Sequence, residues 1–300
     1  MWMPVPDLVL ASPAKLNLFL YVTGRRQDGF HELFSLMAPV SLSDRMEIRF
    51  QGRDIRVFCD HPMVPEDDSN LAWRAARLFM DACRAKKKEL PFEGMSIWID
   101  KKIPVGGGLG GGSSNAAAVL SGLNGYAVRP FSDQELRQMG LTLGADVPFF
   151  LFGGPAFAKG VGEQLEPCGK LPDGWVIICS PGVAASTVNV FKKLEFGLTF
   201  KPVYIMNTGS NALPFDHGFD GKEELHNDLE GPACSLYPEI GSAKEEMALL
   251  LQKNVYMSGS GSSLFALYSG RAAAKAGFDR LNKAWSGTGK KVFLSRIEQP

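Results

Sequence analysis

The sequence predicts an α+β fold rather than a doubly wound parallel one. Stretches with strand-like alternation and stretches with helical periodicity follow one another without the steady strand–helix beat of a parallel α/β sheet. The chain has 300 residues, enough for two domains of roughly 150 residues each or for one large domain. Hydrophobic residues make up 45% and charged residues 21%, the usual mixture of a folded globular chain, so a sizeable core can form.

The first hundred residues are rich in strand patterns. Residues 15–22 alternate at their start and contain many β-formers, which predicts a strand. Residues 46–50 and 55–57 also alternate and are separated by Gly52 and Asp54, which predicts a hairpin. A further short strand is expected at 95–99.

Helices are predicted where apolar residues recur at helical spacing next to capping residues. Residues 70–88 carry such a face, with Ser69 or Asn70 available as N-cap. An alanine-rich helix follows the glycine loop and ends near Gly125, and Ser132 with Glu135 forms a capping box for the next one. The remaining expectations are a strand at 176–179, an irregular loop at 196–222, a helix at 238–253, strands at 255–258 and 263–268, a helix at 271–285 and a strand at 291–297.

Charge and cysteine usage exclude several classes. Lysine and arginine number 32, as do aspartate and glutamate, so no global basic field attracts nucleic acid or an anionic membrane. The five cysteines form no C-x-x-C pair and no cluster with histidine, which favours reduced thiols and argues against structural zinc. The amino terminus lacks the features of a signal or transit peptide, and no apolar run is long enough to span a membrane. We therefore expect a cytoplasmic protein.

Glycine is the unusual residue, with 33 copies that cluster at 106–112 and 259–261. The first cluster runs directly into the alanine-rich helix, so its free amide groups and the helix N-terminus form a cradle for a polyphosphate. A Walker A loop is excluded because no lysine lies within the cluster. A dinucleotide-binding turn matches formally, but the loop does not follow a strand within a βαβ unit. A plain glycine-rich connection is the remaining alternative.

A further interpretation of the glycine loop rests on a resemblance. The stretch PVGGGLGGGSS resembles the phosphate loop of the GHMP kinases, the galacto-, homoserine, mevalonate and phosphomevalonate kinases. Two further stretches, SPAKLNLFL from Ser12 and SGSGSSLF from Ser258, resemble the first and third motifs of that superfamily. The resemblance implies two domains, an N-terminal ribosomal-protein-like domain with a left-handed βαβ unit at 1–164 and a C-terminal ferredoxin-like domain at 165–300.

Within the superfamily the chain looks most like the 4-diphosphocytidyl-2-C-methyl-D-erythritol kinases of non-mevalonate isoprenoid synthesis. The stretches that carry this are PAKLNLFLYVTGRRQDGFHEL, GADVPFFLFGGPAFAKGVGEQLEP and HNDLE. The resemblance implies transfer of phosphate from ATP, with Mg²⁺, to a hydroxyl of a cytidine-diphosphate sugar alcohol. It assigns no Mg²⁺ ligands. We expect no nucleic-acid or membrane partner, and a monomer or weak homodimer.

The resemblance also assigns residues to the reaction. Asp146 of G-A-D-V-P aligns with the catalytic base, and Lys15 sits beside it and the acceptor hydroxyl. Asn17, two residues on in the same strand, projects to the face of Lys15 and can orient the substrate. Without the resemblance, Asp146 would be interpreted as a helix N-cap, and Lys15 would be either an edge-strand lysine or a lysine with a functional partner. ATP is assigned to Asn70, near the adenine, and to the whole phosphate loop: Pro104, Val105, Gly106, Gly107, Gly108, Leu109, Gly110, Gly111, Gly112, Ser113 and Ser114.

The cytosine pocket is assigned to four further residues. Phe30 would stack on the base and His31 would contact its polar edge, where the family usually has Tyr in place of Phe30. Thr187 and Phe191 match positions that complete the pocket. The alternative is that residues 28–31 form a turn that has no part in binding.

Three other functions stay open at this stage. One is a sister kinase of the superfamily, which would have no need of the D-G-F-H-E-L stretch. Another is a nucleotide-binding protein without turnover, which would be marked by loss of Lys15 or Asp146, and both are present. The third is a NAD-dependent oxidoreductase.

For the glycine loop, we expect a side chain at Gly108 or Gly110 to occupy the space that the phosphates need.

Overall fold

The computed structural model describes residues 5–194 and 225–299. The chain divides into two compact units. Unit 1 holds residues 1–14, 43–105 and 110–153, and unit 2 holds 15–42, 106–109 and 154–300. The strands β1 (Leu8–Arg25) and β2 (His31–Arg49) are long enough to contribute residues to both. The stretch expected to be an irregular loop, 196–222, lies outside the described residues.

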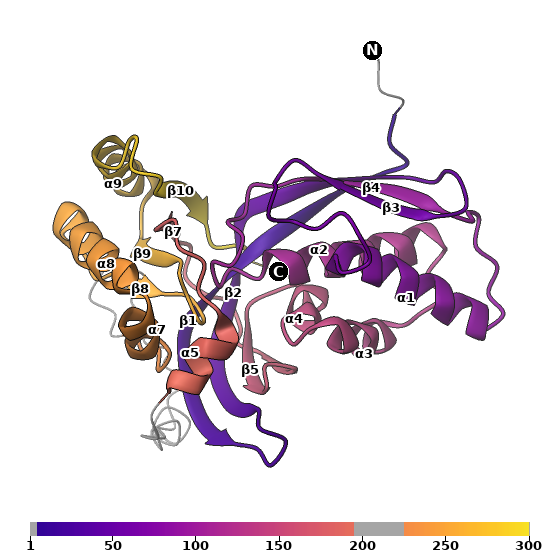
Figure 1. Cartoon of the computed structure of the whole chain (residues 1–300), viewed down its shortest axis with the longest axis horizontal. Coiled ribbons are helices and arrows are strands. Elements are labelled where there is room, and N and C mark those ends of the chain that lie inside the picture. Colours follow the sequence, from indigo (N-terminus) through magenta and orange to yellow (C-terminus); the bar gives the residue numbers. More distant parts are fainter. Residues whose placement is uncertain (1–4, 195–224, 300) are drawn as a thin grey trace. The chain divides into compact units, whose positions relative to one another are not determined.

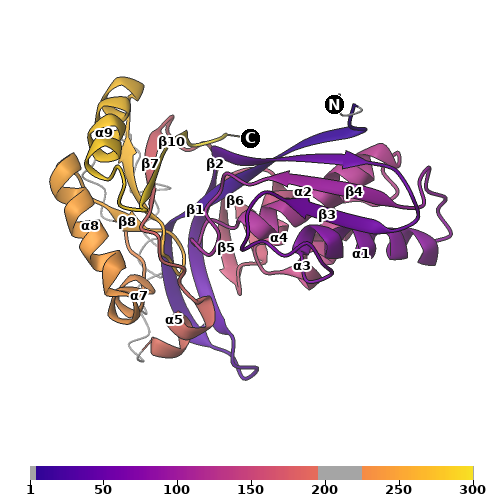
Figure 2. The same cartoon turned by 45° about the horizontal axis from the view of Figure 1, so that its top comes forward.

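Unit 1 packs helices against one face of a sheet (Figures 1 and 2). Strand β4 (Met95–Asp100) pairs with the second half of β2 in antiparallel fashion and with β3 (Ile55–Cys59) in parallel fashion. The hairpin predicted for 46–50 and 55–57 is therefore wrong, because β4 lies between these two strands. Helix α1 (Leu71–Ala85) connects β3 to β4, and the three elements form a parallel βαβ unit.

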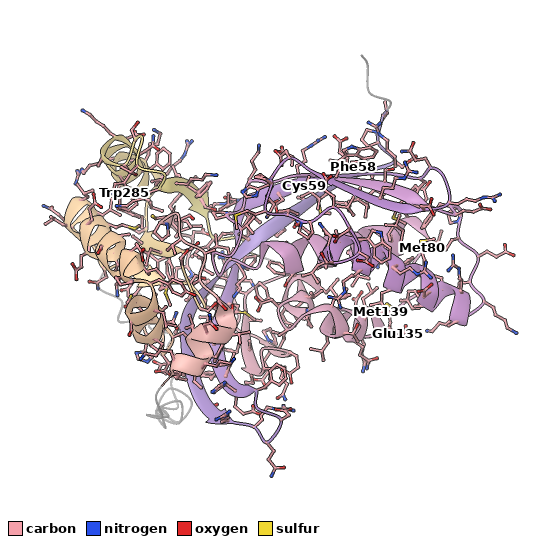
Figure 3. The ribbon with its side chains drawn as sticks, viewed as in Figure 1. Phe58, Cys59, Met80, Glu135, Met139 and Trp285 are labelled. Atoms are coloured by element: carbon pink, nitrogen blue, oxygen red, sulfur yellow. The ribbon has the colours of Figure 1, made fainter. Side chains whose placement is uncertain are left out.

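The helices of unit 1 begin where local sequence predicts. Asn70 caps α1 by accepting a hydrogen bond from the backbone of Ala72, and Ser132 and Glu135 form a complete capping box on α3. The core lies between the helices and the inward residues of β2, β3 and β4, among them Met46, Val57 and Ile97. Figure 3 shows Met80 on α1 and Met139 on α3 within this helical layer. The other helices of the unit are α2 (Gly111–Tyr126), α3 (Asp133–Leu143) and α4 (Val147–Phe152).

Unit 2 contains an antiparallel sheet of four strands in the order β10-β7-β9-β8. In chain order these are the fourth, first, third and second strands, with helices between the first and second and between the third and fourth. This is the β-α-β-β-α-β arrangement of ferredoxin-like domains. Helices α8 and α9 cover one face of this sheet (Figure 1). The bounds are β7 (Trp175–Ser180), α5 (Thr187–Lys193), α7 (Glu230–Leu236), α8 (Pro238–Leu251), β8 (Tyr256–Met257), β9 (Leu264–Tyr268), α9 (Arg271–Ala284) and β10 (Lys291–Arg296).

The first half of β2 also belongs to unit 2, where it pairs with β5 (Ala156–Gly160), which in turn pairs with β6 (Gln164–Pro167). The two-domain α+β prediction is thus confirmed, whereas the division at residue 164 stays a prediction. Within residues 5–194 and 225–299, no helix combines the length and the apolar character needed to cross a membrane.

Candidate active site

In unit 2, the first part of the glycine loop packs against the second glycine turn, residues 258–263. The amide of Ser263 donates to the carbonyl oxygen of Gly107 at 3.0 Å, and Ser258 Oγ donates to that of Gly108 at 3.3 Å. Gly108 has a φ of +73°, and a Cβ there would lie 2.4 Å from the carbonyl oxygen of Ser258. The expectation that a side chain at Gly108 would occupy phosphate space is therefore wrong, because the protein's own turn fills that space.

Lys15 lies on β1 beside this turn and is 4% exposed. Its ammonium donates to Asn17 Oδ1, and Asn17 Nδ2 donates to Ser35 Oγ at 2.8 Å. The backbone amide of Lys15 donates to the carbonyl oxygen of Leu109 in the glycine loop at 3.0 Å. Both ends of the Asn17 amide are thus engaged within unit 2, so its clearest role is to orient the Lys15 ammonium. The predicted sharing of one strand face by Lys15 and Asn17 is confirmed.

In unit 1, the second part of the loop becomes the start of α2. Gly110 is the N-cap, with a left-handed φ of 71°, and no side chain caps the helix. The first amide groups of α2 and the positive end of its dipole therefore stay available to an anion. Ser113 is half-buried, whereas Ser114 is fully buried and its Oγ accepts a hydrogen bond from Ser12 at 2.8 Å. Ser113 is thus the hydroxyl that can serve a ligand, while Ser114 supports the helix.

Asp146 stands at the N-cap position of α4, yet its side chain makes no capping hydrogen bond. Its backbone φ of −83° and ψ of −13° are helical rather than the extended values typical of a capping aspartate. The alternative interpretation, in which the Asp146 carboxylate caps the helix, is therefore wrong. The neighbouring Gly144 approaches the start of α2, because a Cβ on Gly144 would lie 3.7 Å from Ser113 Oγ. Unit 1 thus places the G-A-D stretch beside the open helix N-terminus.

A buried ion pair anchors the loop on the unit 1 side. Asp44 is fully buried and pairs with Lys101, and it also accepts hydrogen bonds from the amides of Lys102 and Ile103, both at 2.8 Å. Asn115 on α2 donates to the same carboxylate at 3.0 Å. One carboxylate therefore joins the chain that enters the loop to the helix that leaves it. Sequence reasoning missed Asp44, because a single aspartate in a strand pattern carries no local signal.

The residues assigned to the cytosine lie in unit 2. The rings of His31 and Phe191 stack on each other with centroids 5.0 Å apart, and Phe30 is 64% exposed at the tip of its turn. Burial, with a smaller contribution from the charge of Arg25, lowers the pKa of His31 below its usual 6.5. His31 is therefore neutral at neutral pH, and a neutral imidazole offers one donor and one acceptor to a base edge. Thr187 Oγ1 lies 2.8 Å from Ser260 Oγ and so contacts the second glycine turn.

Asn70 serves α1 directly. Its Oδ1 accepts from the amide of Ala72 at 2.8 Å, and its Nδ2 donates to the carbonyl oxygen of Pro65 at 2.6 Å. The first turn of α1 reaches the loop, since a Cβ on Gly112 would lie 3.4 Å from Leu71 Cδ1. The predicted N-cap role of Asn70 is confirmed, and its contact with adenine stays a prediction.

Comparison with known proteins decides the family. The family models described as "GHMP kinases N terminal domain" and "GHMP kinases C terminal" match residues 70–154 and 221–287. A 4-diphosphocytidyl-2-C-methyl-D-erythritol kinase of Syntrophotalea carbinolica is 40% identical over 283 residues, which cover 94% of this chain and 96% of that one. The chain belongs to the GHMP kinase family. It is an ATP-dependent small-molecule kinase.

Other relatives agree with this assignment. A protein of the same name from Geobacter sulfurreducens is 41% identical and covers 89% of this chain and 92% of its own length. A crystal structure of 4-(cytidine 5'-diphospho)-2C-methyl-D-erythritol kinase superposes with a TM-score of 0.75 at 34% identity and covers 98% of this chain and 100% of its own. A homoserine kinase from Cytophaga hutchinsonii, with a TM-score of 0.69 at 19% identity and coverage of 100% and 97%, shows the shared fold alone.

Proposed function

We propose that this GHMP kinase transfers the γ-phosphoryl group of ATP to a hydroxyl of 4-diphosphocytidyl-2-C-methyl-D-erythritol and produces the 2-phosphate and ADP. The observation that carries the proposal is the Lys15–Asn17 pair, which is buried and oriented beneath the glycine loop. The substrate named by relatives at about 40% identity supports the choice of acceptor.

In the proposed reaction, the bond between the γ-phosphorus and its bridging oxygen breaks as the acceptor oxygen bonds to that phosphorus. Asp146 accepts the proton of the hydroxyl as the general base. Lys15 supplies positive charge to the developing alkoxide, with its direction set by Asn17. The amides of the loop and of the first turn of α2 hold the phosphates.

The donor atoms present fit a magnesium ion carried by the nucleotide. Among the described residues, no three His, Cys, Asp or Glu side chains gather into a cluster that would hold a metal alone. Mg²⁺ keeps several waters and takes few protein ligands beside the phosphates. Ser113 at the start of α2 is the hydroxyl that would hold it, and the ion neutralises charge on the phosphates when bound.

We propose that the cytidine base binds beside His31 and Phe191. The ring of Phe191 gives a face for stacking and the neutral imidazole of His31 offers polar contacts. Phe30, as an exposed ring at the turn, covers the base from the other side of the pocket on binding. The loss of the family's tyrosine hydroxyl at this position leaves stacking intact.

The test is ADP release in a coupled assay with 4-diphosphocytidyl-2-C-methyl-D-erythritol, homoserine and mevalonate as acceptors. We expect turnover with the cytidine substrate alone, and turnover with either of the others instead would refute the proposed acceptor. Asp146→Asn should lower kcat by about 10²–10⁴-fold, since it removes the base and keeps the shape, while ATP still binds.

Lys15→Ala provides the second arm of the test. If both side chains act on the same transition state, the double variant should lose much less than the product of the two single losses. An Asp146→Asn enzyme with near-normal kcat would refute the base assignment, and fully multiplicative losses would show that the two residues act independently.

A further inference from the structure

Asn227, in the HNDLE stretch, has no role in the reaction described above, yet its side chain is fully engaged. Its Nδ2 donates to the carbonyl oxygens of Met257 and Gly259, both at 2.8 Å. Its Oδ1 accepts from the amide of Leu229 at 2.9 Å. An amide side chain has two N–H donors, and here both bind carbonyl groups at the start of one neighbouring turn, one just before the turn and one within it.

The turn that Asn227 holds is the second glycine turn. Its own backbone hydrogen bonds are few, and they include those from Ser258 N to the carbonyl oxygen of Ser263 and from Gly261 N to that of Ser258. The strand before it, β8, is only two residues long. A side chain that binds two carbonyl groups on either side of Ser258 therefore adds restraint that the backbone does not supply.

The same turn contacts the pair formed by Lys15 and Asn17. A Cβ on Gly259 would lie 3.1 Å from Asn17 Oδ1 and 3.6 Å from Lys15 Nζ. Ser258 Oγ accepts from the amide of Asn17 at 3.1 Å and donates to the carbonyl oxygen of Gly108. The residues on which Asn227 acts are therefore those that touch Lys15, Asn17 and the phosphate loop.

Asn227 is itself anchored to the strand that carries Lys15. The amide of Leu20 donates to the carbonyl oxygen of His226 at 2.8 Å, and the amide of Asp228 donates to that of Leu20 at 3.0 Å. The Asp228 carboxylate accepts from the amide of Val22 at 2.7 Å. Hydrogen bonds thus connect β1, residues 226–228 and the second glycine turn into one closed ring of contacts within unit 2.

We infer that Asn227 is a positioning residue of the kinase reaction, which acts through the second glycine turn to hold Lys15 and Asn17 in place. The inference rests on the proposed function, because it assigns Lys15 a part in the transfer. Aspartate cannot replace Asn227, because its carboxylate would face two carbonyl oxygens without a proton to donate. Small displacements of catalytic groups are costly, since a shift of about 1 Å can lower the rate by about 10²-fold.

The experiment compares Asn227→Ala with a control variant of similar stability loss. Met247→Ala empties space in the buried core of unit 2 and removes no hydrogen bond, so it reports what destabilisation alone does. Both enzymes are assayed well below their melting temperatures for kcat and for KM of both substrates. We expect Asn227→Ala to lose kcat by about tenfold or more with KM changed less than about threefold, and Met247→Ala to keep kcat within about twofold.

Hydrogen exchange provides a readout independent of activity. The amides of Ser258 and Ser263 are hydrogen-bonded in the turn and in its contact with Gly107, so their exchange should be faster in Asn227→Ala by about tenfold or more. If Asn227→Ala does not fold, Asn227→Ser, which retains one hydroxyl donor, carries the same comparison and should show a smaller loss.

The outcomes separate the two proposals. Faster exchange with unchanged kcat, or a kcat loss no larger than that of Met247→Ala at equal stability, would overturn the positioning role while the proposed function stands. Wild-type enzyme without turnover on the cytidine substrate would refute the proposed function itself, and the exchange rates would still report whether Asn227 holds the turn.

Discussion

Replacement of Gly108 by alanine tests how tightly the phosphate loop is packed against the second glycine turn. Two penalties act at this position. The left-handed φ of +73° costs a residue with a Cβ about 1–2 kcal/mol. The added carbon would also lie 2.4 Å from the carbonyl oxygen of Ser258 and 2.9 Å from that of Gly261.

The overlap sets the size of the second penalty. Close carbon–oxygen contacts in proteins lie at about 3.3–3.6 Å, so the turn must move by about 0.9 Å or more to accept the methyl group. Overpacking of this kind costs about 1–3 kcal/mol. We therefore expect Gly108→Ala to destabilise the protein by about 2–5 kcal/mol, and the displaced turn to weaken ATP binding and lower kcat.

Gly287 provides the matched control. Its φ is +77°, but nothing lies within 4 Å of a Cβ built there. Gly287→Ala therefore carries the backbone cost alone, and the difference between the two variants isolates the clash. Calorimetric melting in the presence and absence of ATP, together with KM for ATP, measures both effects. If Gly108→Ala has the same melting temperature as Gly287→Ala and an unchanged KM for ATP, the tight packing of the loop against the turn is refuted.

Two further predictions concern the buried ion pair and the base pocket. Asp44→Asn should destabilise the protein by about 3–5 kcal/mol, because it leaves Lys101 buried without its counter-charge, whereas Glu93→Gln at the exposed pair with Arg53 should cost less than about 1 kcal/mol. Chemical unfolding measures both, and equal effects would contradict the importance of the Asp44 network. His31 has a folded pKa below its unfolded value, so its contribution to stability is complete above pH 6.5 and declines as the pH falls through the lower folded pKa. The melting temperature of the wild type minus that of His31→Ala should therefore decrease from pH 8 to pH 5. An imidazole whose NMR titration has a midpoint above 6.5 would contradict this prediction.

Local chemistry made several elements predictable. The N-cap at Asn70 and the capping box of Ser132 and Glu135 each depend on residues within three positions of one another, and both form as expected. The glycine loop and its helix were also readable, because glycine clusters and alanine-rich helices leave a direct mark on composition. The family resemblance then supplied the proposed roles of Lys15 and Asp146. The residues alone favoured a helix N-cap for Asp146 and left the role of Lys15 undecided.

Tertiary structure decided the features that depend on partners distant in the chain. Residues 46–50 and 55–57 alternate as a hairpin would, but β3 pairs instead with β4, which returns after α1. Asp44 collects donors from residues 101–103 and 115, and Asn227 binds a turn 30 residues away. Alternation shows which face of a strand is buried and not which strand lies beside it, and a lone polar residue does not show which groups will meet it. Those choices are made by the packing of the whole domain, because only there does burial force each polar group to find a partner.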